Sequence, residues 1–193
     1  MTLYQFFGIL SAFIFIIAYI PYIFSIVRGE TKPHPFSWML WTLIGIISAY
    51  LYVQVGARET LPFAFAGTIL PFIIMCVSFR NWKGDFSLFD YFCLGFSLLA
   101  IVTYVMFHSA NFSLTLSLCA DAVAFLPTMR KTYLDASTEN LATWLLFLLS
   151  YITSLVATIP RFSYGVVLFP AYLTVCGGVM CFLVLRGRLK KAS

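Results

Sequence analysis

Seven apolar runs follow one another along the chain, separated by short polar segments. The runs cover residues 3–27, 36–55, 61–79, 88–107, 112–129, 141–159 and 166–185. An α-helix of about 20 residues crosses the roughly 30 Å hydrocarbon layer of a bilayer, and each run approaches or exceeds that length. The first run follows no basic segment and is too long for a signal peptide, so we expect it to remain as a helix. The pattern therefore predicts seven membrane-spanning helices.

Basic residues are distributed unevenly between the connecting segments. With seven spans, the segments after the first, third and fifth helices share one side of the membrane with the C-terminal tail. That side carries ten of the twelve Lys and Arg residues, and the other side carries Arg58 and Arg161. Lys and Arg accumulate in cytoplasmic segments. We therefore expect a multi-pass protein of the inner or plasma membrane, with its N-terminus outside and its C-terminus in the cytoplasm.

Composition agrees with this location and removes other classes. Of the 193 residues, 62% are hydrophobic and 10% are charged, and a soluble domain of this size has too little interior for such a chain. The net charge of +5 would suit nucleic acid, but membrane topology explains where the basic residues lie. The five cysteines fall within the apolar runs without metal-ligand spacing. We expect no metal, no cofactor and no nucleic-acid partner.

A proline and a tryptophan recur at one interval in both halves of the chain. Pro21 precedes Trp38 by seventeen residues, and Pro127 precedes Trp144 by seventeen. The two copies are offset by 106 positions, and the same offset superimposes further identical residues, among them Ser11 and Ser117, Ala18 and Ala124, and Ser48 and Ser154. Proline and tryptophan are scarce, so their shared interval indicates an internal duplication.

The duplication predicts an all-α integral membrane fold in which two parallel three-helix repeats flank a seventh helix. Residues 1–86 would form the first repeat, 87–110 the linking fourth helix, and 111–193 the second repeat with a basic cytoplasmic tail. A linking helix is required because three spans alone would invert the second repeat. Pro21 and Pro127 each remove a helical hydrogen bond, which makes them candidate hinges, with static kinks as the alternative.

These motifs resemble those of the PQ-loop and SWEET (MtN3) superfamily of seven-helix membrane transporters. The shared features are the proline near the end of the first helix of each repeat and the Ser37-Trp38 and Thr143-Trp144 pairs that open the next helix. Residues 121–131 with Glu139, beside the sequence KPHPFSWMLW, also resemble a group of bacterial seven-helix proteins. The resemblance implies transport of a small solute by alternating access. Some members of this superfamily couple transport to protons through an acidic residue in or beside the second repeat, and Asp121 is the residue here that matches that description.

Asp121 also stands out without the resemblance. It is the one ionisable residue near the middle of a predicted span, about nine residues from either end of 112–129. A carboxylate at this depth is costly, and such residues usually face a cavity. Desolvation favours the protonated carboxyl, so Asp121 is a candidate for proton coupling or substrate recognition, with packing against a neighbouring helix as the alternative. Its counterpart in the first half is Phe15.

Several other residues are candidates by position. Trp38 and Trp144 either wall a central cavity, where flat rings stack on sugars, aromatic solutes or cations, or anchor helix ends at the membrane interface. Further candidate lining residues, for which ordinary helix packing is the alternative, are Trp41, Ser48, Ser117, Ser150 and Tyr151. We expect His34 to be a solvated loop histidine.

No enzyme class fits the chain. An intramembrane aspartyl protease needs two facing acids, and only Asp121 lies deep in a span; the HExxH and GxSxG motifs are absent. We therefore expect a transporter of a small polar solute that works by alternating access, with protons as a second partner if Asp121 couples to them. A non-transporting seven-helix receptor for a cargo or ligand is the alternative. The sequence leaves a homo-oligomer open.

Overall fold

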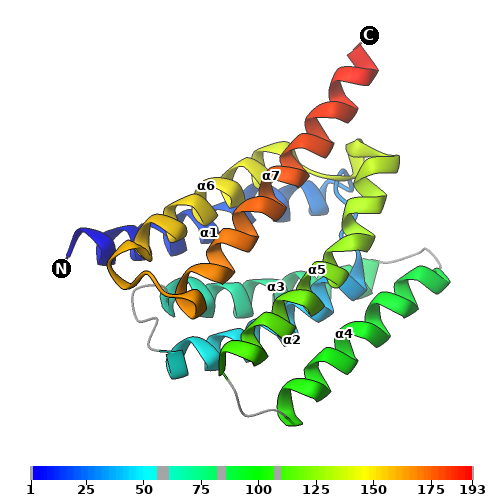
Figure 1. The fold of residues 1–193 in the computed structure, drawn as a ribbon. Coiled ribbons are helices and arrows are strands. Elements are labelled where there is room, and N and C mark those ends of the chain that lie inside the picture. Colours follow the sequence, from blue (N-terminus) through cyan, green and yellow to red (C-terminus); the bar gives the residue numbers. More distant parts are fainter. Residues whose placement is uncertain (1, 56–60, 82–85, 107–109, 193) are drawn as a thin grey trace.

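The computed structural model describes residues 2–55, 61–81, 86–106 and 110–192. In these residues the chain forms seven α-helices and two short 3₁₀ helices (Figure 1). The elements are α1 (Leu3–Val27), α2 (Pro35–Val55), α3 (Leu61–Asn81), α4 (Leu88–Met106), α5 (Ala110–Leu134), η2 (Ala136–Thr138), α6 (Leu141–Ala157), η3 (Ile159–Arg161) and α7 (Tyr164–Ala192). The predicted all-α class and the seven helices are confirmed.

Polar side chains mark the start of several helices. Thr2 and Gln5 form a capping box at the start of α1, in which each side chain accepts the backbone N–H of the other residue. Ser87 and Asp90 make the same reciprocal arrangement at the start of α4. Asn140 caps α6. Because these caps satisfy N–H groups that lack a partner within the helix, the apolar runs begin as helices where the sequence places them.

Two helices are longer than their apolar runs. The fifth was expected over 112–129 and the seventh over 166–185, but α5 continues to Leu134 and α7 to Ala192. The added residues include Lys131 and Arg186, whose polarity ends the apolar run. Lys and Arg are good helix formers, so the backbone continues its helical hydrogen bonds beyond the apolar segment. The basic tail is therefore helical over the described residues.

The helices pack in two groups of three. In the first group, α3 packs against both α1 and α2, and in the second group α7 packs against both α5 and α6. The groups meet where α1 packs on α6 and α2 packs on α5. α4 packs mainly on α5 and lies at the edge of the molecule (Figure 1). The centre of the fold is therefore bounded by helices from both halves of the chain.

Many large apolar side chains lie on the surface of the fold, and several hydroxyl groups are buried beside its apolar core. Large apolar side chains are exposed on every α-helix, among them Phe13, Val53, Ile69, Leu99, Leu126, Leu149 and Phe182. The hydroxyl residues Ser11, Ser37, Thr143 and Ser150 are fully buried. Among the described residues, Leu3–Val27 and Tyr164–Lys190 are long and apolar enough to cross a membrane, and three other helices contain shorter apolar stretches. These features allow association with a membrane.

His34 is buried, so the expectation of a solvated loop histidine was wrong. Its side chain lies under α4, with Nε2 3.4 Å from Oδ1 of Asp90, and its ring contacts those of Phe36 and Phe86. Burial lowers the pKa of His34, although the neighbouring Asp90 carboxylate acts in the opposite direction. The polar loop before α2 therefore helps to hold α4 in place.

Candidate functional site

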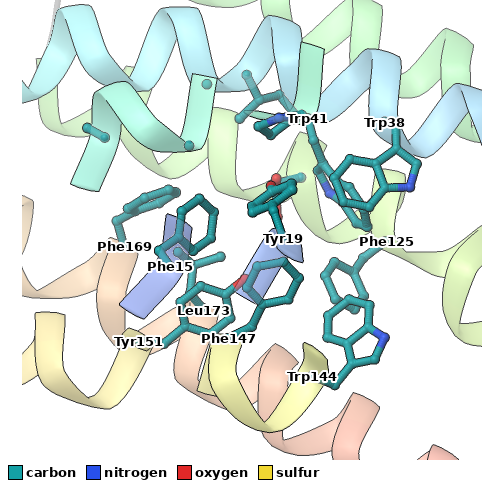
Figure 2. A pocket seen from close by; sticks show the side chains of 16 residues that line it. Phe15, Tyr19, Trp38, Trp41, Phe125, Trp144, Phe147, Tyr151, Phe169 and Leu173 are labelled. Atoms are coloured by element: carbon teal, nitrogen blue, oxygen red, sulfur yellow. The ribbon is translucent and has the colours of Figure 1, made fainter. Parts of the chain in front are cut away.

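A cavity of about 80 Å³ lies between the two helix groups, several times what one buried water needs. Nine of its sixteen described lining residues are aromatic: Phe15, Tyr19, Trp38, Trp41, Phe125, Trp144, Phe147, Tyr151 and Phe169. In Figure 2, Trp38 and Trp144 lie at one end of the cavity and Phe169 lies at the other. The cavity is therefore an aromatic chamber to which both halves of the chain contribute.

Six of these rings form a closed circuit that we call the aromatic girdle. Ring centroids of neighbouring members lie 4.9 to 6.1 Å apart, a range in which aromatic rings attract one another. In order around the circuit, the members are Trp38, Trp41, Phe125, Trp144, Phe147 and Tyr19. They come from α1, α2, α5 and α6, so the girdle joins the two helix groups.

The girdle residues correspond in pairs along the chain. Each member from α1 or α2 is followed, 106 positions later, by a member from α5 or α6: Tyr19 by Phe125, Trp38 by Trp144, and Trp41 by Phe147. Three further pairs of lining residues have the same offset: Phe15 with Asp121, Gly45 with Tyr151, and Gly67 on α3 with Leu173 on α7. Of the eleven lining residues from α1, α2, α5 and α6, ten therefore belong to such a pair, and Ile44 is the exception.

Asp121 is the single carboxylate among the lining residues that the structure describes. Its side chain is 5% exposed, and Oδ2 accepts a hydrogen bond of 2.6 Å from the hydroxyl of Tyr172 on α7. The described lining contains no Lys, Arg or His. The negative charge of an ionised Asp121 therefore meets a hydroxyl donor but no basic side chain within the lining of the cavity.

The candidate residues from the sequence divide into three sets. Trp38, Trp41, Asp121, Trp144 and Tyr151 all line the cavity. Ser150 does not: its hydroxyl donates to the backbone carbonyl of Ser11 over 2.8 Å and joins α6 to α1. The side chains of Ser48 and Ser117 lie outside the described residues. Pro21 and Pro127 lie within α1 and α5, and neither lines the cavity.

Sequence reasoning missed several residues of the site. Tyr19, Phe125, Phe147 and Phe169 line the cavity, and Tyr172 supplies the hydrogen bond to Asp121. The duplication offers a signal for the first three, because a position that stays aromatic after a shift of 106 is unusual even in an aromatic-rich chain. The same signal extends to Phe169, which follows Phe63 by 106 positions, whereas Tyr172 follows Ala66 at this offset and has no comparable signal.

Hydrogen bonds and an ion pair tie two polar connections together at the end of the fold beyond Trp38 and Trp144. Lys131 forms an ion pair with Glu139 and donates to the backbone carbonyl of Lys32 over 2.7 Å. The backbone N–H of Lys32 donates to the carbonyl of Thr138 over 3.3 Å. We call Lys32, Lys131, Thr138 and Glu139 the loop clasp. It holds the α1–α2 connection against the α5–α6 connection.

The loop clasp also contacts the aromatic girdle. The side chain of Glu139 is fully buried, and its Oε2 accepts a hydrogen bond of 3.0 Å from Nε1 of Trp144. This bond links the ion pair to Trp144, which lines the cavity. A movement of the loop clasp would therefore also move Trp144 in the aromatic girdle.

The described residues offer no group of three or more His, Cys, Asp or Glu side chains placed to hold a metal ion. Comparison with protein-family models, curated proteins and solved structures finds no match for this chain.

Proposed function

We propose that this protein is a membrane transporter of a small polar solute that works by alternating access between two three-helix bundles. One observation carries the proposal: both halves contribute position-matched residues to a single cavity between them, and that cavity holds one buried carboxylate. A site at the junction of two repeats is where a rocking movement can expose it to either side in turn.

The packing of the helices supports a parallel duplication. Exchanging α1, α2 and α3 for α5, α6 and α7 turns each main contact into another contact that is also present: α2 on α3 into α6 on α7, α1 on α3 into α5 on α7, and α1 on α6 into α5 on α2. α4 has no such equivalent and fits the role of a linking helix. The fold thus agrees with the resemblance to the PQ-loop and SWEET superfamily.

A multi-pass location in the membrane is part of the proposal. Exposed apolar side chains on all seven α-helices would contact lipid, and several buried hydroxyl groups are bonded within the bundle to a carbonyl one turn earlier on the same helix. The excess of basic residues on one side would place the C-terminus and the loop clasp in the cytoplasm.

The aromatic girdle and the loop clasp would form the cytoplasmic gate of the transporter. Asp121 lies one helical turn before Phe125, on the side of the girdle away from the clasp. A solute beside Asp121 can reach the cytoplasm only if the rings part and the Lys131–Glu139 pair separates or shifts. Pro21 and Pro127 lie near this end of α1 and α5, where a hinge would open the gate.

Asp121 would carry the proton in a coupled cycle, and its replacement tests that role. Its carboxylate accepts a hydrogen bond from the hydroxyl of Tyr172, and the described lining contains no Lys, Arg or His. Asp121→Asn should therefore abolish solute uptake driven by a pH gradient, because no other group in the described lining can take over the proton. Uptake is measured in proteoliposomes with radiolabelled metabolites chosen by a thermal-shift screen at acid and neutral pH.

Glu30→Gln is the matched control, because it removes an exposed loop carboxylate far from the cavity wall. This variant should transport like the wild type, and both variants should insert and purify normally. Unchanged pH-driven uptake by Asp121→Asn would reject the coupling role. Ligand binding without flux in any gradient would instead favour a seven-helix receptor, the second candidate function.

A further inference from the structure

We infer that the cavity binds a small monovalent organic cation, a primary or quaternary ammonium group, held between the aromatic rings and the Asp121 carboxylate. This inference rests on the proposed function only in treating the cavity as the solute site. It names the class of solute that the lining recognises.

The charge of the cavity is the first argument. Asp121 is buried, and no Lys, Arg or His stands among the described lining residues to neutralise it. A buried carboxylate without a counter-charge is strongly disfavoured, and one hydrogen bond from Tyr172 offsets part of that cost. Either a proton or a cationic ligand must supply the missing charge. An anionic solute would meet no basic side chain in the described lining.

The aromatic lining is the second argument. Faces of Trp, Tyr and Phe rings attract cations, and boxes of such rings recognise quaternary ammonium groups. The six rings of the aromatic girdle all line the cavity, and the ring of Phe15, which also lines it, packs on that of Phe147 (Figure 2). A cation in this space would contact aromatic rings and one carboxylate. These contacts would compensate for the water that the cation loses on binding.

A polyol or sugar fits the same space poorly. Each sugar hydroxyl needs a donor or an acceptor once it leaves water, and a hydroxyl left without a partner weakens binding. Besides Asp121, the polar side chains of the described lining are two tyrosines and three tryptophans, and the indole N–H of Trp144 is already bonded to Glu139.

The test compares a cation with its neutral isostere. The probes are choline and tetramethylammonium chloride, with 3,3-dimethyl-1-butanol as the uncharged analogue of choline and sodium chloride as the ionic-strength control. Binding to the purified full-length protein is followed by calorimetry and by tryptophan fluorescence. Both cations should bind saturably, and the neutral isostere should bind about tenfold more weakly or worse, since a desolvated cation–π contact is worth roughly 2 kcal/mol.

Single variants test the contributions of the Asp121 charge and of the aromatic rings separately. Asp121→Asn should lose cation affinity by removing the charge, and Trp41→Leu should lose it by replacing a ring with an aliphatic side chain. Phe36→Leu is the aromatic control, because the Phe36 ring stacks on Phe86 outside the cavity. It should bind choline like the wild type. The comparison of choline with its isostere needs no variant, so it decides the question even if a variant fails to fold.

The outcomes distinguish this inference from the proposed function. Equal affinity for choline and the neutral isostere, or no saturable binding of either cation, overturns the cation site. Binding of choline without flux in proteoliposomes upholds the cation site and rejects transport. Flux of neutral solutes that choline does not inhibit upholds transport and rejects the cation site.

Discussion

At the scale of single residues, the role of each buried polar group follows from the partner that it bonds. Ser37 donates to the carbonyl of Ala124 and Ser150 donates to that of Ser11, so each hydroxyl joins one half of the chain to the other. Asp121 differs from both because its carboxylate faces the cavity and accepts from a side chain, not from the backbone. Polarity alone did not distinguish these roles in the sequence.

His34 gives a prediction at this scale. Burial lowers the pKa of His34 in the folded protein. Below a pH of about 6.5, His34 therefore binds a proton more readily in the unfolded chain than in the folded protein. The folded state should therefore lose stability relative to His34→Gln as the pH falls from 7.5 to 5.5. Gln can still donate toward Asp90 but does not titrate. Free energies of unfolding in detergent, measured for both proteins at each pH, check the prediction; a constant difference between them would contradict it.

At the scale of elements, the loop clasp holds two connections that the apolar pattern treats as separate. The α1–α2 connection contributes a backbone carbonyl and N–H of Lys32, and the end of α5 contributes the ammonium group of Lys131. Because Glu139 is fully buried, its carboxylate group is stabilised by the ammonium group of Lys131 and by the indole N–H of Trp144. The stability of this end of the fold should therefore depend on the ion pair more than an exposed pair would.

A double-mutant cycle tests the clasp. Lys131→Met leaves the Glu139 charge buried without its cation and should cost about 3 to 5 kcal/mol of unfolding free energy. Adding Glu139→Gln removes that charge and should restore most of the loss. Unfolding is measured in mixed micelles for the wild type, both single variants and the double variant. A double variant as unstable as Lys131→Met would show that the pair does not act in this way.

At the scale of the whole molecule, two similar halves enclose one site but do not make it symmetric. The offset of 106 matches Tyr19 with Phe125 and Trp41 with Phe147, yet it also matches Phe15 with Asp121. The aromatic girdle is therefore shared evenly, whereas the charge comes from the second half alone. In the proposed transporter, the aromatic girdle suits a gate that two similar bundles form together. Asp121, which only the second half supplies, suits recognition or coupling.

Membrane orientation is the prediction that belongs to this scale. In a bacterial host, a fluorescent protein fused after Ser193 should fluoresce and an alkaline phosphatase fused there should be inactive, because the basic residues place that end in the cytoplasm. Fusions after Thr158, which follows α6, should give the opposite pair of results. If both sites gave the same result, an odd number of spans between them would be excluded. If the phosphatase were active after Ser193 and the fluorescent protein bright after Thr158, the proposed orientation would be reversed.

The sequence by itself determined the all-α class, the seven helices and the position of Asp121 within the fifth. These depend on local hydropathy and on the scarcity of charge, which a single chain displays directly. It also contained the interval of 106 that relates the girdle residues.

Only the tertiary structure decided which residues meet. The use of Ser150 in packing, the burial of His34, the bond from Tyr172 to Asp121 and the closure of six rings into a girdle all depend on how each helix is rotated against its neighbours. In this chain most helices are apolar on nearly every face, so hydropathy cannot fix that rotation. Side-chain shape and hydrogen bonds between helices fix it instead.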